Sequence, residues 1–252
     1  MNTAEAAPSA AVLLIGNELL SGRTQDSNLN FIAKHMVDKG IRLQEARVIQ
    51  DDPHVIISSV NELRARYSYV FTTGGIGPTH DDITADCVAD AFGVELKIHP
   101  EAKARLLAHF KVINVEPNED RLRMARIPEG ASLVDNKVSA APGFRMDNVF
   151  VFAGVPRIMQ AMLESVLPML ESGPVIKSVT IVCNLGEGTV ASALRELQVS
   201  YPAVDLGSYP GKIADRSRLS LVARGADESE LSEVEDCLKQ MVLALGGDVL
   251  TE

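Results

Sequence analysis

The stretch TTGGIGPTHDDIT at residues 72–84 decides how this chain folds. An apolar run at residues 69–71 precedes it and a helical pattern at residues 85–92 follows it, which predicts a strand, a glycine turn and a helix. Glycines let backbone approach a bulky anion, and a helix N-terminus presents unpaired N–H groups and a partial positive charge. Asp81 and Asp82 close the turn and repel a bare phosphate. Because a divalent cation between carboxylates and phosphate reconciles the two halves, we expect a phosphate-and-metal site.

Short apolar strands alternate with amphipathic helices around this turn. Strands are expected at residues 10–15, 41–48, 69–72 and 149–152, and helices at residues 27–39, 53–66, 84–92, 100–112 and 156–170. This alternation indicates an α/β fold with a mainly parallel sheet covered on both sides. Ligands of such sheets bind outside the carboxyl ends of the strands. The loops at residues 16–18, 72–84 and 153–156 are predicted to meet there.

A different pattern follows the expected linker at residues 171–174. Strands at residues 178–183, 204–209, 218–223 and 248–250 and helices at residues 189–197 and 228–245 predict a small α+β domain of βαββαβ order. It carries no obvious chemical motif. The predicted organisation is a disordered lead-in at residues 1–9, a larger domain at 10–172 and the small domain at 175–252.

Composition narrows the class of protein. The 252 residues carry 24 Lys and Arg against 34 Asp and Glu, a net charge of −10, which disfavours nucleic-acid binding. No window approaches the roughly 20 apolar residues of a membrane-spanning helix, and the N-terminal residues lack the basic start of a signal peptide. Three scattered cysteines without a CxxC pair argue against disulfides or zinc and for the cytoplasm.

Each acidic candidate has a structural alternative. Asp81 and Asp82 can hold a cation and activate water, or they can cap the following helix; their place beside three glycines and Pro78 favours the functional interpretation. Glu18 is a third ligand or a base, or a solvated loop residue. Asp26 is a ligand or part of a helix-capping box. His80, beside the carboxylates, is a weaker candidate.

The candidate phosphate contacts are mostly glycines in turns. They are Gly16, Asn17, Thr73, Gly74, Gly75, Gly77, Pro78, Thr79, Gly143, Gly154 and Pro156. Gly143 lies in a turn expected before a hairpin, and Gly154 and Pro156 open a helix, so structural roles remain open for them. Arg121, Arg123, Arg145 and Arg157 are further candidates that, taken singly, are typical of surface residues.

Several segments in order resemble one family. They are IGNELLSGRTQDSN (15–28), TTGGIGPTHDDITADCVADAFG (72–93), IPEGASLVDN (127–136), APGF (141–144) and AGVPRIMQAMLESVLP (153–168). They look like the N-terminal module of the competence/damage-inducible protein A (CinA) family, within the MogA-like, molybdopterin-binding fold group. The resemblance implies a three-layer α/β/α domain. It implies acidic site positions at Glu18, Asp26, Asp81 and Asp82.

The same resemblance suggests an activity. In molybdenum-cofactor relatives the pocket binds molybdopterin and handles its adenylylation with Mg²⁺. CinA-type modules are associated with metal-dependent pyrophosphatase activity on ADP-ribose and related nucleotides, including FAD in relatives fused to FAD synthase. Two departures stand out: Arg123-Met124-Ala125 replaces a frequent Lys-Gln-Ala triplet, and Ala153 replaces a frequent proline. The C-terminal amidase domain of full-length CinA proteins is expected to be absent, and deamidase activity with it.

The resulting hypothesis is a metal-dependent nucleotide pyrophosphatase that uses Mg²⁺, Mn²⁺ or Co²⁺. Asp82, Asp81 and Glu18 are the predicted catalytic residues, and Asp81, Asp82 and Asp26 the predicted metal ligands. One alternative is a molybdopterin- or pterin-binding protein of cofactor biosynthesis. Another is a non-catalytic regulatory protein that binds a nucleotide. The expected partner is a small nucleotide or pterin, and self-association is an expectation from the resemblance.

Overall fold

The computed structural model describes residues 7–213 and 216–250, and side chains outside 212–217. The chain divides into two compact units, Met1–Gly173 and Pro174–Glu252. Most of the lead-in expected to be disordered, residues 1–6, lies outside the described residues, and the first strand already begins at Ser9.

A six-stranded sheet forms the centre of the first unit. Its strands, in spatial order, are β2 (Arg42–Ile49), β1 (Ser9–Ile15), β3 (Tyr69–Thr73), β8 (Val149–Phe152), β7 (Gly143–Met146) and β6 (Ser132–Val134). The first four run parallel, while β7 is antiparallel to both β8 and β6. The expected mainly parallel sheet is confirmed.

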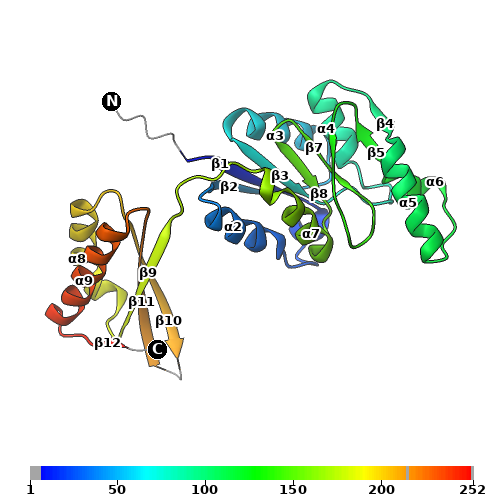
Figure 1. The fold of residues 1–252 in the computed structure, drawn as a ribbon. Helices are drawn as coiled ribbons and strands as arrows, with labels where there is room; N and C mark the ends of the chain where they lie inside the picture. Colours follow the sequence, from blue (N-terminus) through cyan, green and yellow to red (C-terminus); the bar gives the residue numbers. More distant parts are fainter. Residues whose placement is uncertain (1–6, 214–215, 251–252) are drawn as a thin grey trace, which may run out of the picture. The chain divides into compact units, whose positions relative to one another are not determined.

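Helices cover both faces of this sheet (Figure 1). One face packs against α2 (Asn28–Asp38) and α7 (Pro156–Val166), the other against α3 (Pro53–Arg66) and α4 (Thr84–Phe92). Alternate side chains of β1 enter the two cores: Val12 and Leu14 join the first, Leu13 and Ile15 the second. A strand buried on both faces needs a continuous apolar run, which is what residues 10–15 provide. The three-layer α/β/α architecture is therefore confirmed.

The segment between α4 and β7 contains most of the elements that the sequence did not predict. Besides the expected α5 (Pro100–Val112), it holds α6 (Glu119–Arg123) and an antiparallel pair of β4 (Leu96–Ile98) and β5 (Arg126–Pro128). The short helix α1 (Asn17–Leu20) was also missed, and the helix predicted at residues 156–170 consists of α7 and the 3₁₀ turn η1 (Leu167–Met169). Elements this short show too little periodicity to be detected, because tertiary contacts and not local propensity stabilise them.

The second unit has the predicted βαββαβ order. Its elements are β9 (Lys177–Cys183), α8 (Glu187–Ser200), β10 (Asp205–Ile213), β11 (Arg216–Gly225), α9 (Glu228–Ala244) and β12 (Val249–Leu250). The strands form an antiparallel sheet of order β10-β11-β9-β12. Its core contains residues of both helices, such as Val190, Leu231 and Leu238. Over the described residues of the whole chain, no helix has the length and apolar character needed to cross a membrane.

Candidate functional site

The glycine turn is tied to three surrounding elements. The backbone N–H of Gly74 donates to the carbonyl of Phe152 at the end of β8 (3.1 Å). Thr84, the first residue of α4, donates from its hydroxyl to Gly74 O (3.0 Å) and from its N–H to Gly75 O (2.9 Å). Gly74 has φ 101°, which side chains rarely adopt, and a Cβ there would collide with the carbonyl of Ile15 at the end of β1. The turn therefore requires glycine here.

The second predicted loop lies against this turn. A Cβ on Gly154 would lie only 3.3 Å from Gly74 Cα, so the loops after β3 and β8 touch through their glycines. Neighbouring parallel strands bring their carboxyl ends together, and the two loops follow adjacent strands of the sheet. The structure thus brings the glycine turn and the Gly154 loop together.

Asp82 is held in place within the turn. One of its oxygens accepts hydrogen bonds from the Thr79 N–H (2.8 Å) and the Thr79 hydroxyl (2.6 Å). A Cβ on Gly77 would lie 2.6 Å from the same oxygen, so glycine leaves room for the carboxylate. Helix capping does not explain either aspartate, because α4 begins after Ile83 without a side-chain cap. Asp81 is exposed beside the exposed His80.

Glu18 reaches the same end of the sheet from the first turn of α1. Its carboxylate lies against Gly16, where a Cβ would stand 2.5 Å from each carboxylate oxygen. The N–H of Asn17 donates to Asp51 Oδ2 (2.8 Å), so Asp51 anchors this loop from the end of β2. Asp51 was not predicted; its only signal was an acidic pair directly after a predicted strand.

Asp26 has the structural role that the sequence left open. Its two oxygens accept from the N–H groups of Asn28 (3.2 Å) and Leu29 (3.0 Å), which caps the start of α2. No group of three or more His, Cys, Asp or Glu side chains suited to a metal occurs among the described residues. Asp26, Asp81 and Asp82 are therefore not gathered into one such group, and their role as metal ligands stays a prediction.

A cavity of about 430 Å³ opens beside the glycine turn. Two carboxylates, Glu18 and Asp82, line it, and its lining is completed by Gly74, Gly75, Ile76, Gly77, Pro78, Met124, Asn136, Ser139, Ala141, Ala153, Gly154, Val155, Ile158 and Met162. An apolar wall with a few polar groups, in this range of volume, is typical of small-molecule sites. Asp81, Asn17 and Thr79 do not line it.

Sequence reasoning missed one wall of this cavity. The buried Asn136 side chain donates to Ser139 Oγ (2.7 Å) and Ala141 O (2.9 Å), and accepts from the N–H groups of Val138 and Ser139. It thereby folds residues 136–141 into the wall. The available signal was its place at the end of the PEGASLVDN segment. Gly143, in contrast, has a packing role, because a Cβ there would collide with the carbonyl of Val151.

Arginines approach the turn from the side of α6 and β5. Arg123 and Arg126 line a narrow hollow together with Gly75, Gly77 and Asp82. Arg126 is engaged in a bidentate pair with Asp86 (2.9 and 2.8 Å). The Nε atoms of Arg123 and Arg126 are both buried without a hydrogen-bond partner among the described residues, but of the two only Arg126 forms an ion pair there. Arg123 is therefore the arginine best placed to accept an anion here.

Residues 11–172, more than half of the chain, match the family described as probable molybdopterin binding domain. The chain belongs to this family. Residues 176–245 match the FAD synthase middle domain.

Individual relatives agree with the CinA resemblance. A crystal structure of the protein CinA, of unknown function, from Thermoplasma acidophilum is 31% identical with a TM-score of 0.60, and the match covers 65% of this chain and 98% of that chain. Protein TK1472 of Thermococcus kodakarensis is 34% identical over 94% of this chain and 98% of its own length. A CinA-like protein of Gemmatimonas aurantiaca is 33% identical over 92% of this chain and 58% of its own. The recognition of a CinA-type module is confirmed.

Proposed function

We propose that this protein hydrolyses the phosphoanhydride bond of a nucleotide such as ADP-ribose or FAD with the help of a divalent metal ion. One observation carries the proposal: Glu18 and Asp82 line the same cavity as the glycine turn, and neither has an ion-pair partner in the described part of the chain. Unpaired carboxylates beside a phosphate-binding turn need a cation when an anionic substrate arrives. The match of residues 176–245 to the FAD synthase middle domain supports a nucleotide as substrate.

The residues present suit a hard cation. Mg²⁺ is commonly held by one or two carboxylates, while substrate phosphates and water complete its octahedron. Glu18 and Asp82 supply those carboxylates, and Thr79 fixes the orientation of Asp82 through two hydrogen bonds. A metal bound there would neutralise the pyrophosphate and activate water.

The remaining groups bind and orient the substrate. Backbone N–H groups of the glycine turn and the guanidinium of Arg123 are available to phosphate oxygens. Ile76, Ile158 and Met162 offer the apolar wall on which a base or flavin ring can pack. Asp81, which lies outside the cavity lining, has no assigned role in this arrangement.

The proposal is tested by incubating the full chain with ADP-ribose or FAD and Mg²⁺, Mn²⁺ or Co²⁺, with release of AMP as the readout. We expect AMP only when metal is present, and its loss in Asp82→Asn. Asp38→Asn, an exposed carboxylate at the far end of α2, is the matched control. Absence of AMP with every nucleotide and metal contradicts the hydrolase.

A second candidate function is pterin binding in cofactor biosynthesis, which is favoured by the match of residues 11–172 to probable molybdopterin binding domains. It predicts tight binding of a pterin without AMP release. Nucleotide binding without any product would instead support a regulatory protein. Self-association and a cytoplasmic location stay predictions.

A further inference from the structure

The side chains of the cavity wall differ in whether they still have a hydrogen bond to give. Of the described side chains that line the cavity, four carry nitrogen or oxygen atoms: Glu18, Asp82, Asn136 and Ser139. Glu18 and Asp82 are carboxylates, which only accept hydrogen bonds when they are ionised. An acceptor atom of a ligand can therefore meet a side-chain donor on this lining only at Asn136 or Ser139.

Asn136 has no hydrogen-bonding capacity left for a ligand. Its Nδ2 donates to Ser139 Oγ (2.7 Å) and Ala141 O (2.9 Å), and its Oδ1 accepts from the N–H groups of Val138 (2.9 Å) and Ser139 (3.2 Å). A side-chain amide has two N–H donors and two oxygen lone pairs, so all four are used. The buried amide of Asn136 therefore holds the wall, and Ser139 is the residue that remains for a ligand.

Ser139 keeps a free proton in a fixed position. Its Oγ accepts from Asn136 Nδ2 and its backbone N–H donates to Asn136 Oδ1, so two contacts with one side chain orient the residue. The hydroxyl also carries a proton of its own, and within the described ranges this proton has no acceptor. Because the Asn136 amide lies on one side of Oγ, the proton points away from it. Ser139 is half-buried and lines the cavity, where it supplies a neutral donor.

The remaining parts of the cavity suggest which group of the ligand this donor meets. Backbone N–H groups of the glycine turn and the guanidinium of Arg123 are available to phosphate oxygens. Ile158 and Met162 suit a ring, and a few placed polar groups orient a ring that is held by apolar contact. The wall at residues 136–141 leads into β7, where a Cβ on Gly143 would lie 3.2 Å from Met162 Sδ. The wall that carries Ser139 thus adjoins the apolar side chains.

We propose that Ser139 is a specificity-determining residue that donates a hydrogen bond to an acceptor atom, a ring nitrogen or a keto oxygen, on the base of the bound nucleotide. The inference rests on the proposed function for the class of ligand. A donor in a fixed position selects rings that carry an acceptor at the matching place, because a ring without it leaves the donor unpaired. The contact lies on the ring and not at the phosphoanhydride, so its loss should raise KM for ADP-ribose and leave kcat unchanged.

The test measures binding of AMP to the full chain by titration calorimetry with Mg²⁺ present. AMP carries a base but no phosphoanhydride bond, so it is not hydrolysed during the titration. Ser139→Ala should weaken AMP binding about fivefold to tenfold, the usual worth of a neutral hydrogen bond. Ser139→Thr keeps the hydroxyl and should bind AMP as wild type does. Ser58→Ala, which removes an exposed hydroxyl of α3 that donates to the Val55 carbonyl, is the matched control.

AMP analogues separate a contact with the base from a structural role or a contact with phosphate. In three analogues, N1, N3 or N7 of adenine is replaced by a C–H group. One of them should bind wild type about fivefold to tenfold more weakly than AMP does, and should bind Ser139→Ala as tightly as AMP binds that variant. A structural role or a phosphate contact would weaken AMP and all three analogues by the same factor.

The inference is overturned if wild type does not bind AMP, if Ser139→Ala binds AMP as tightly as wild type, or if every analogue keeps its wild-type ratio to AMP in Ser139→Ala. The expected binding pattern without AMP release from ADP-ribose rejects the hydrolase alone. AMP release from ADP-ribose by wild type, together with unchanged ratios in Ser139→Ala, rejects the role of Ser139 alone.

Discussion

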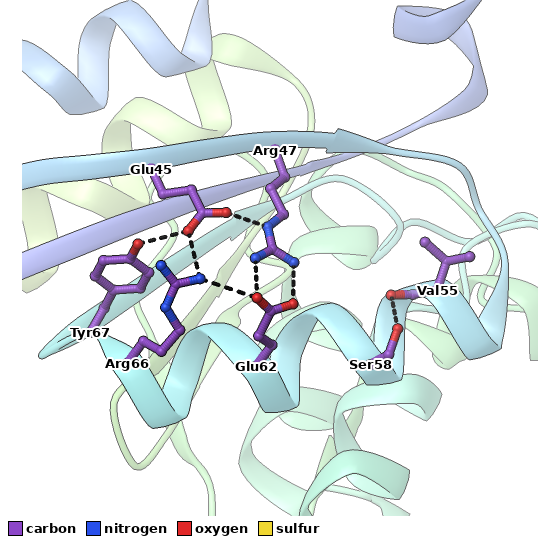
Figure 2. Close-up of polar contacts among 7 residues, drawn as sticks. All are labelled: Glu45, Arg47, Val55, Ser58, Glu62, Arg66 and Tyr67. Carbon is purple, nitrogen blue, oxygen red and sulfur yellow. Dashed lines mark hydrogen bonds and ion pairs between the residues drawn. The ribbon is translucent and has the colours of Figure 1, made fainter.

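The first unit holds two groups of carboxylates with opposite surroundings. Between β2 and α3, Glu45 and Glu62 are enclosed by basic and hydroxyl donors (Figure 2). Arg47 donates hydrogen bonds to both carboxylate oxygens of Glu62 (2.7 Å each) and one to Glu45. The hydroxyl of Tyr67 donates to the other carboxylate oxygen of Glu45 (2.7 Å). At the cavity, Asp82 accepts hydrogen bonds from the N–H and hydroxyl of Thr79, and neither Glu18 nor Asp82 has an ion-pair partner in the described segments.

The two groups differ in whether their charges are paired within the protein. Hydrogen bonds from Arg47 lower the pKa of Glu62 to about 2, and those from Arg47 and Tyr67 lower the pKa of Glu45. These charges are satisfied within the protein. The cavity carboxylates Glu18 and Asp82 have no such ion pair in the described part of the chain, which is the feature that the proposed function uses. Burial raises the pKa of Cys87, on the helix after the glycine turn, to about 12, so this thiol stays protonated at neutral pH.

The largest expected effect separates the two groups directly. Asp82→Asn should reduce kcat/KM for ADP-ribose about hundredfold or more, while its melting temperature stays near that of wild type because the amide oxygen can still accept from Thr79. Glu62→Gln should lower the melting temperature and leave kcat/KM unchanged. Steady-state kinetics and calorimetry on both variants check this. If both variants lose kcat/KM, or both lose only thermal stability, the two groups of carboxylates do not differ in role.

A second test shifts the Asp82 carboxylate without removing it. Gly77→Ala places a Cβ only 2.6 Å from Asp82 Oδ2. This distance is too short for a contact, so the carboxylate must move. Misplacement of a reacting group is costly, and we expect kcat/KM to fall about tenfold. Gly188→Ala, whose Cβ would meet nothing within 4 Å, is the control. Equal activity of the two variants would show that the position of Asp82 does not matter.

A third, smaller effect concerns the paired group. Arg47→Met keeps the aliphatic stem but removes the guanidinium that joins Glu45 to Glu62. Because these pairs lie partly in solvent, which screens them, we expect only a small fall in the free energy of unfolding. Urea unfolding measures it, and turnover should be unaffected. A loss of turnover comparable to that of Asp82→Asn would remove the functional distinction between the two groups.

The smallest effect is the pH dependence of the same network. The pKa of Glu62 is lowered from 4.5 to about 2 in the folded protein, so its pairing stabilises the fold above 4.5 and is lost as pH falls towards 2. The difference in urea midpoint between wild type and Glu62→Gln should therefore be largest near neutral pH and shrink over this window. A difference that grows as pH falls would contradict the assignment.

Prediction from sequence succeeded for strands and loops with strong local signals. The run at residues 10–15 identified a strand buried on both faces, and the glycines of residues 74–77 identified the turn between β3 and α4. It failed for α6 and for the wall built by Asn136, since few residues carry those features and distant contacts hold them. Asp26 was predicted as a metal ligand together with Asp81 and Asp82. In the structure it caps α2 and lines a small hollow with Glu18, Asn28 and Gly154, outside the lining of the cavity that contains Asp82.

Sequence by itself determined the layers of the first unit, the order of elements in the second, and the position of the glycine turn, because all three follow from local periodicity and residue type. Only the tertiary structure decided which carboxylates meet. Asn28 and Gly154 are hydrogen-bonded across 126 positions of the chain, and Arg123 reaches the turn from a helix that local patterns do not reveal. Such juxtapositions depend on how whole strands and helices pack, so no short stretch of residues encodes them.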